Sequence, residues 1–389
     1  MSFAIICCME PQGMVADGFE AVRDAFVANF ENQNEVGASV AATVNGEPVV
    51  DLWGGTATFD HGDGPWEENT IINVWSTTKT MAALTCLVLA DRGELDLYEP
   101  IATYWPEFAA NGKEQIATRH VLAHTAGLSG WDEPLVPDDY LDHDKLARLH
   151  AAQAPWWEPG SQSGYHAISQ GYLLGEIVKR VDGRSLGTFF AEEIAGPLDA
   201  DFHIGTPAEH DPRIAHVIPP PSGKLDTAES DDPNSVVVRT TSNPTTSADM
   251  ALRPEWRRAE SPAGNGHGNA RSVARIHTAT ANDGSAFGVD ILSAEGIERI
   301  FDEQIEGTDL VLGVPMRLGM GFGLPSETVP LPNPRTCFWG GWGGSLAVID
   351  CDAHISFSYV MNRMDDSTLG DERGLNLLMA VYGALLAAG

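Results

Sequence analysis

The sequence predicts an α+β fold in which an antiparallel sheet is flanked by helices and joined to a mostly helical region. Residues 38–44 and 49–53 are apolar runs on either side of Asn45-Gly46, the dipeptide most typical of a tight β-hairpin. The C-terminal part again predicts strands and then a helix, at 338–340, 346–350, 355–362 and 375–388. Both ends of the chain are therefore expected to share one sheet with terminal helices against it.

The remaining elements follow from hydrophobic periodicity. Residues 18–32 carry apolar side chains at helical spacing, and the middle of the chain has its clearest helices at 168–181 and 271–282. Residues 206–244 are rich in Pro, Asp and Ser, which favours a long surface excursion. We expect two domains, a discontinuous sheet domain of residues 17–112 with 301–389 and a mostly helical domain of residues 113–300.

Composition sets limits on the partners and the compartment. The 389 residues are 43% hydrophobic and 20% charged, as in globular proteins, and the formal net charge is −32. That charge argues against nucleic acid and anionic membranes as partners. The longest apolar runs, 81–90 and 377–388, are too short to span a bilayer. The first eight residues have no basic flank and do not predict a signal peptide, so we expect a cytoplasmic protein. The oligomeric state is not predicted.

The five cysteines are few and scattered, and no C-x-x-C pair occurs among Cys7, Cys8, Cys86, Cys337 and Cys351. This pattern favours neither a disulfide framework nor a zinc site. His120 and His124 stand four residues apart, as helical metal ligands can, but no Glu follows His120 and no third ligand is evident. We therefore expect no metal and no organic cofactor.

The strongest chemical signal is Ser76-Thr77-Thr78-Lys79, which precedes an apolar helical stretch. Residues three apart share one face of a helix, so Ser76 and Lys79 can touch at its N-terminus. Serine becomes a nucleophile when a neighbouring base takes its proton, and lysine can be that base when burial depresses its pKa. Alone, S-x-x-K is also compatible with a helix cap and a solvated lysine. The chain has only five lysines, however, and Lys79 lies among apolar residues.

Further motifs make the chain resemble the serine β-lactamase and penicillin-binding-protein family, and in particular its carboxylesterase branch, the family VIII esterases. The resemblance covers about residues 17 to 385, and its motifs follow the family's order at 74–79, 121–128, 159–160, 165–167, 265–268 and 339–341. It implies an antiparallel sheet flanked by helices, a helical domain, and an active site in the cleft between them. No G-x-S-x-G elbow, P-loop or Rossmann fingerprint competes with it.

The resemblance implies that Tyr165 is the second catalytic residue. A phenol near a lysine ammonium loses its proton more readily, and it can relay a proton between Ser76 and a leaving group. Family members that bind lactams usually have Asn two residues after this Tyr. Here the position is Ala167, which puts lactam and peptide substrates in doubt and favours esters.

Trp339-Gly340-Gly341 occupies the place of the lactamase K-T-G motif. A lysine there would bind a substrate carboxylate, whereas the esterase branch typically has W-G-G. Glycines let a strand backbone approach the substrate closely. The resemblance implies that the N–H groups of Trp342 and Ser76 form the oxyanion hole.

The tryptophans Trp131, Trp156, Trp157, Trp339 and Trp342 flank these motifs, and they are expected either to pack the core or to line an apolar acyl or alcohol pocket. His267 lies between two glycines and has no assigned role.

We predict a serine hydrolase that cleaves carboxylic esters of short to medium acyl chain through a Ser76 acyl-enzyme, with Lys79 and Tyr165 sharing the proton transfer. Which of the two is the base is left open. The alternatives are β-lactamase or D-Ala-D-Ala peptidase activity, acyl transfer to a small acceptor, and a non-catalytic binding protein on the same scaffold.

Overall fold

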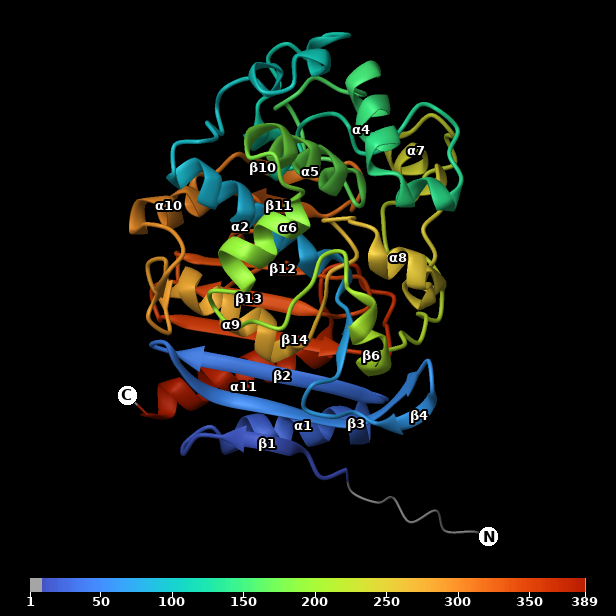
Figure 1. The fold of residues 1–389 in the computed structure, drawn as a ribbon. Coiled ribbons are helices and arrows are strands. Elements are labelled where there is room, and N and C mark those ends of the chain that lie inside the picture. The colour runs from blue at the N-terminus through green and yellow to red at the C-terminus, as the bar shows by residue number, and fades with distance from the viewer. Residues whose placement is uncertain (1–8, 389) are drawn as a thin grey trace.

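The computed structural model describes residues 9–388, so Cys7 and Cys8 lie outside the described part. Strands from the two ends of the chain form one antiparallel sheet, in which the blue and red strands of Figure 1 lie side by side. Its order is β1-β3-β2-β14-β13-β12, and β4 pairs with β3. The strands are β1 (Gln12–Val15), β2 (Gly37–Val44), β3 (Glu47–Phe59), β4 (Gly62–Pro65), β12 (Thr336–Gly340), β13 (Leu346–Asp350) and β14 (Ile355–Met361). The predicted α+β class, hairpin and C-terminal strands are confirmed.

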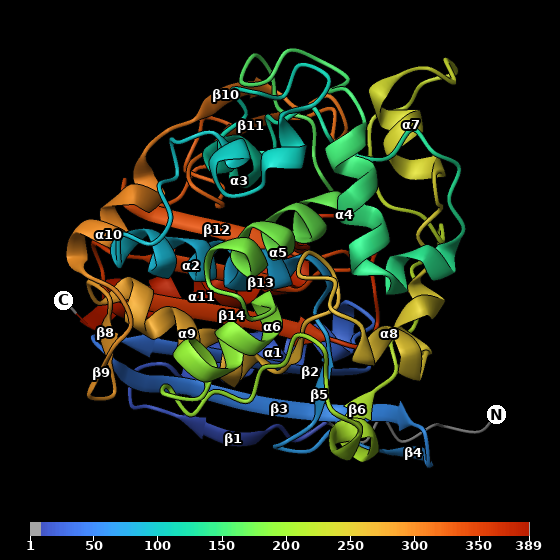
Figure 2. The same ribbon diagram turned by 45° about the horizontal axis from the view of Figure 1, so that its top comes forward.

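Helices cover both faces of this sheet. α1 (Glu20–Asn32) and α11 (Glu372–Ala388) pack on each other and on one face, and α9 (Ala270–Ala281) packs on the other face against β2, β13 and β14 (Figures 1 and 2). The central strands are accordingly buried on both sides, which explains why the sequence shows continuous apolar runs there. α9 thus lies against the sheet although it falls within residues 113–300, and the two-domain division remains a prediction.

The second region is mostly helix and loop, as the sequence predicted, and much of it lies above the sheet in Figure 1. Its helices are α3 (Thr118–Leu122), α4 (His143–Ala152), α5 (Ser169–Val181), α6 (Leu186–Phe190), α7 (Val236–Ser242), α8 (Pro254–Arg258) and α10 (Ala294–Glu298). Its short strand pairs are β8 (Ser285–Ala286) with β9 (Val289–Asp290), and β10 (Ile305–Thr308) with β11 (Pro315–Leu318). No helix in the described residues is long and apolar enough to cross a membrane.

α2 (Thr78–Asp91) runs between the two regions. Its residues 78–90 are all buried, and it contacts α5, α6 and α10. A helix that is apolar all round belongs in the core of a large protein. A small sheet leads into it, in which β5 (Ile71–Asn73) pairs with β6 (Ile214–Ala215) and β7 (His267–Gly268). The N-terminus of α2 is therefore held at the junction of the sheet and the helical region.

Candidate active site

Ser76 lies in a sharp turn between β5 and α2. The 3₁₀ turn Trp75–Thr77 begins with Trp75 at φ +49°, a left-handed conformation that is costly for a bulky residue. The Thr78 hydroxyl holds the turn, because it donates to the Trp75 carbonyl (2.5 Å) and accepts from the N–H of Gly266 (2.9 Å). Ser76 is thereby fixed at the start of α2 and is 7% exposed.

Lys79 points from the first turn of α2 back to Ser76. Its Nζ lies 3.0 Å from Ser76 Oγ and donates to the carbonyls of Ala167 (2.6 Å) and Ala263 (2.8 Å). The side chain is buried, and none of the ion pairs among the described residues includes it. Burial without a counter-charge holds the pKa of Lys79 well below its usual value of 10.5. The site therefore favours the neutral amine.

Tyr165 also contacts Ser76, and its OH donates to Ser76 Oγ at 2.6 Å. Burial raises the pKa of Tyr165 well above its usual value, although the hydrogen bond to Ser76 opposes the rise. The Lys79 Nζ lies 4.9 Å from the tyrosine ring. The sequence-based expectation that a nearby ammonium would acidify the phenol was therefore wrong. Burial dominates both groups, and it favours a neutral amine beside a neutral phenol.

The hydrogen atoms of a neutral amine fit this geometry. Its two N–H groups satisfy the two carbonyls, and its lone pair is left for the Ser76 hydroxyl. Ser76 can then donate to Lys79 while accepting from Tyr165, so that every polar atom of the trio is paired. This arrangement allows proton transfer from serine to lysine, and from tyrosine to a group bound at serine.

Two residues that the sequence-based prediction did not assign as site residues position the trio. Asp309 is buried, and its Oδ1 accepts from the backbone N–H groups of Tyr165 (3.0 Å), Val311 (2.9 Å) and Leu312 (2.9 Å). Asn265 pins the loop that presents the Ala263 carbonyl, because it accepts from Ser261 N–H (2.9 Å) and donates to the Trp256 carbonyl (2.9 Å). Asn265 belongs to the motif at residues 265–268 on which the family resemblance partly rests, whereas no sequence pattern marks Asp309.

The end of β12 runs close to Ser76. A Cβ on Gly341 would lie 2.3 Å from the Val74 carbonyl oxygen and 3.2 Å from Ser76 N, so only glycine allows this approach. Within residues 9–388, the backbone N–H of Trp342 has no hydrogen-bond acceptor, and it follows Gly341 directly. Gly340 is equally confined, since its Cβ would meet the backbone at Leu369. The predicted oxyanion segment thus adjoins the nucleophile.

The predicted tryptophans divide into two groups. Trp339 lies against Tyr165, with ring centroids 5.8 Å apart, and Trp342 packs on Trp75 at 5.1 Å. Trp131 is instead a core residue against Tyr140, His150 and Tyr172, while Trp156 stacks with the Arg239 guanidinium and Trp157 packs on His166.

The histidines singled out in the sequence have backbone partners. The ring of His120 accepts from Ala117 N–H (2.9 Å), and that of His124, at φ +60°, accepts from His166 N–H (3.1 Å). His124 also packs on Tyr165 and Trp339. His267 is buried in β7, and burial lowers its pKa to about 3, so it stays uncharged.

An antiparallel sheet under a helical region, with a buried lysine and a tyrosine that both contact one serine, is the arrangement that the resemblance implied. The chain belongs to the Beta-lactamase family, whose model matches residues 22–380. It is similar to a solved family VIII carboxylesterase, with 42% identity, a TM-score of 0.90, and coverage of 96% of this chain and 100% of that one.

Two further relatives cover most of the chain. A penicillin-binding protein homologue from Caulobacter crescentus has 37% identity and a TM-score of 0.90, over 96% of this chain and 99% of its own. The esterase/beta-lactamase LipL of Mycobacterium tuberculosis is 33% identical over 89% of this chain and 81% of LipL. The resemblance inferred from the motifs is confirmed.

Proposed function

We propose that the protein is a carboxylesterase that hydrolyses short to medium acyl esters through an acyl-enzyme on Ser76. The observation that carries this proposal is the placement of Ser76 Oγ between Lys79 Nζ at 3.0 Å and the Tyr165 hydroxyl at 2.6 Å. The names of two relatives, a family VIII carboxylesterase and an esterase/beta-lactamase, support it.

The first half-reaction begins when neutral Lys79 takes the Ser76 proton as Oγ attacks the ester carbonyl. The N–H groups of Ser76 and Trp342 stabilise the oxyanion of the tetrahedral intermediate. The C–O bond to the alcohol then breaks. Tyr165 donates its proton to the departing alkoxide and recovers one from the Lys79 ammonium, so the amine is free again. The alcohol leaves, and Ser76 carries the acyl group.

The second half-reaction uses the same groups on water. Lys79, through Tyr165, accepts a proton from the water that attacks the acyl carbonyl. The bond to Ser76 Oγ breaks, the Lys79 ammonium returns its proton to Oγ, and the carboxylic acid leaves. Apart from the ester and water, every step uses side chains and backbone N–H groups of this chain.

The surroundings of the trio favour an ester over a lactam. Tyr165, Ala167 and Trp339 share an apolar cluster with Val237 of α7 and Leu312 of the β10–β11 connection. An apolar cluster suits an acyl chain. Ala167 offers no amide to a lactam side chain, and Trp339 offers no cation to a carboxylate. We expect the enzyme to act on small esters in the cytoplasm.

The test is hydrolysis of p-nitrophenyl butyrate and of a chromogenic cephalosporin by wild type and Ser76→Ala. We expect ester cleavage that is lost by at least about 10³-fold in the variant, with little lactam cleavage in either. Ester turnover that survives in folded Ser76→Ala would refute the mechanism. Strong cephalosporin cleavage would instead favour the lactamase alternative, and added alcohols would reveal acyl transfer by a new ester product. A wild-type protein that a fluorophosphonate does not label would favour the binding-protein alternative.

A further inference from the structure

A buried ionic cluster lies behind the oxyanion segment, and the mechanism does not use it. The Arg373 cluster consists of Glu35, which follows α1, Tyr359 on β14, and Asp371 and Arg373 at the start of α11. Arg373 donates to Glu35 Oε1 (3.1 Å) and to Asp371 Oδ2 (2.5 Å), and Tyr359 donates its hydroxyl proton to Glu35. Burial raises the pKa of Glu35 to about 7, although the charge of Arg373 opposes the rise. Burying charges costs free energy unless they are paired and hydrogen-bonded, so we expect the cluster to have a structural or functional role that offsets this cost.

The cluster grips the turn that carries Trp342. One guanidinium nitrogen of Arg373, Nη2, donates to the Gly343 carbonyl at 3.1 Å and to the Arg363 carbonyl at 2.9 Å. The Gly343 carbonyl also accepts from Asp365 N–H at 2.9 Å. Gly343 is the residue directly after Trp342, so a single peptide unit separates the one whose carbonyl Arg373 holds from the one that carries the proposed oxyanion N–H.

The other end of the turn is held as well. Gly341 N–H donates to the Ser345 carbonyl at 2.8 Å, and the Ser345 hydroxyl donates to the Val74 carbonyl at 2.8 Å, beside Ser76. The Ser345 hydroxyl further lies 2.9 Å from that of Thr77. Ser345 therefore ties the turn to the nucleophile, while Arg373 ties it to the C-terminal helix.

The packing leaves this turn no room to shift. Gly343 and Gly344 have φ values of +95° and +127°, which favour glycine. A Cβ on Gly344 would lie 2.2 Å from Asp371 Oδ2, and one on Gly343 would lie 2.6 Å from Met364 Cβ. The turn thus lies directly against the Arg373–Asp371 ion pair.

We propose that Arg373 is a positioning residue for the oxyanion hole, held in place by Glu35 and Asp371. Through the Gly343 carbonyl it fixes the orientation of the turn, so that the N–H of Trp342 converges with that of Ser76 on one point. Oxyanion donors act only when they are aimed at the charge that develops in the transition state. This inference rests on the proposed acyl-enzyme function.

The test compares Arg373→Met and Arg373→Lys with a matched control, Asp350→Asn. Asp350 is also buried, accepts from the Tyr382 hydroxyl of α11 and from Asn333, both at 2.8 Å, and lies at the end of β13 away from the turn. Turnover of p-nitrophenyl butyrate is measured per active site, with the sites counted by the end point of fluorophosphonate labelling. The inhibition constant of butylboronic acid is measured too, because its tetrahedral adduct places an oxygen in the hole.

We expect Arg373→Met to lower kcat by about 10- to 100-fold, with KM within about twofold and weaker boronate inhibition. Arg373→Lys retains a donor and is expected to lie between Arg373→Met and wild type. Asp350→Asn lowers the melting temperature but keeps kcat per active site and boronate affinity. If Arg373→Met does not fold, Glu35→Gln, which loosens the guanidinium, is expected to lower kcat with the same unchanged KM.

Three outcomes would overturn the positioning role. The Arg373 variants would keep the kcat of wild type per active site, they would change only KM, or Asp350→Asn would lose as much kcat as Arg373→Met. Failure of the proposed function is distinguishable, because the wild type itself would then show no esterase activity.

Discussion

Two of the five lysines are buried, and they show how similar surroundings serve different ends. Lys79 and Lys113 each donate to two backbone carbonyls, and burial lowers the pKa of both. Lys79, however, has the Ser76 hydroxyl 3.0 Å from Nζ, whereas Lys113 has the ring of Phe108, with its centroid 5.4 Å away. A buried amine becomes a candidate base only where a hydroxyl stands at its lone pair.

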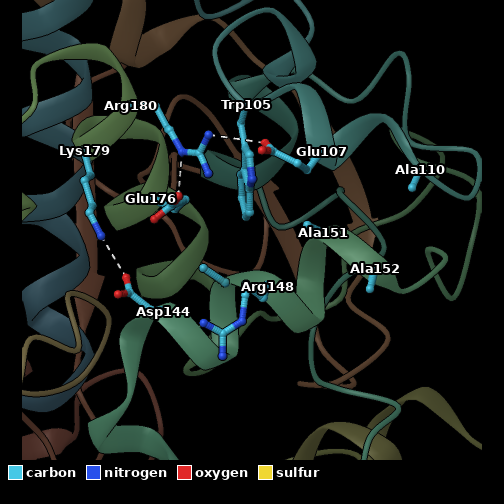
Figure 3. Close-up of a pocket in the computed structure, with 11 residues that line it drawn as sticks. Trp105, Glu107, Ala110, Asp144, Arg148, Ala151, Ala152, Glu176, Lys179 and Arg180 are labelled. Atoms are coloured by element: carbon cyan, nitrogen blue, oxygen red, sulfur yellow. Dashed lines mark hydrogen bonds and ion pairs between the residues drawn. The ribbon is translucent and has the colours of Figure 1, made fainter.

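The surface near Lys113 also differs from the serine site, because it is an open groove lined by charged side chains. The Ala110 carbonyl that Lys113 contacts borders an open groove of about 620 Å³ between α4, α5 and the 3₁₀ turn Pro106–Ala109 (Figure 3). Most charges drawn there are paired with one another, as Arg180 is with Glu176 (2.7 Å) and Lys179 with Asp144 (2.8 Å). The groove shares no residue with the serine site. The size of this groove therefore does not by itself mark it as the catalytic site.

The largest expected effect separates the two lysines. Lys79→Met removes the base and is expected to lower kcat/KM for p-nitrophenyl butyrate by about 10³-fold or more. Lys113→Met removes another buried lysine side chain and is expected to leave kcat/KM within about threefold of wild type. Steady-state kinetics normalised by the concentration of folded protein, checked by circular dichroism, measures both. Similar losses in the two variants would mean that Lys79 acts through packing.

The next largest effect comes from Tyr165, whose hydroxyl lies beside the Lys79 site, whereas the Phe108 ring beside Lys113 carries no hydroxyl. Tyr165→Phe removes the proton donor to the leaving group, so the loss depends on how much that group needs a proton. We expect kcat to fall by about 10²- to 10³-fold for an alkyl butyrate and by about 10-fold for p-nitrophenyl butyrate. Equal losses on both esters would argue that Tyr165 only orients Ser76.

The sequence predicted which side chains meet at Ser76 better than it predicted their protonation states. Ser76, Lys79 and Tyr165 could be selected because their spacing and neighbouring motifs are local patterns. The raised pKa of Tyr165 could not be anticipated, because it depends on how completely the folded chain excludes water from the phenol. The strands and the hairpin were likewise predictable from periodicity, whereas the packing of α9 on the sheet depends on tertiary contacts.

Residues that position others are the ones that sequence reasoning missed. Asp309 acts through three backbone N–H groups, and Arg373 acts through the carbonyl of Gly343. Backbone partners impose no requirement on the partner's side chain, so neither pairing leaves a pattern in the sequence.

A smaller effect is a shift in the pH dependence of activity. The neutral form of Lys79 is the active one, so kcat/KM is expected to fall as the pH is lowered through the pKa of the coupled Lys79–Tyr165 pair. Burial holds the pKa of Lys79 well below 10.5, so the acid limb is expected at lower pH than for an exposed lysine. His166 cannot account for this limb, because burial lowers its pKa to about 3. A midpoint near pH 10.5 in the pH–rate profile would contradict the neutral amine.

The smallest effect concerns stability and tests Lys113 alone. Burial lowers its pKa to about 8, while the unfolded chain keeps the ordinary value of 10.5. Between these two values the unfolded state binds more protons, so the free energy of unfolding contributed by Lys113 rises with pH. Between pH 7 and pH 9.5, the free energy of unfolding of wild type is expected to rise relative to that of Lys113→Met by on the order of 1 kcal/mol. Urea titrations at the two pH values measure this difference. Lys224→Met, which removes an exposed lysine, controls for the change in net charge. If both variants follow the same pH dependence, the amine of Lys113 keeps its charge in the folded protein, and burial with two carbonyls is not enough to neutralise a lysine here.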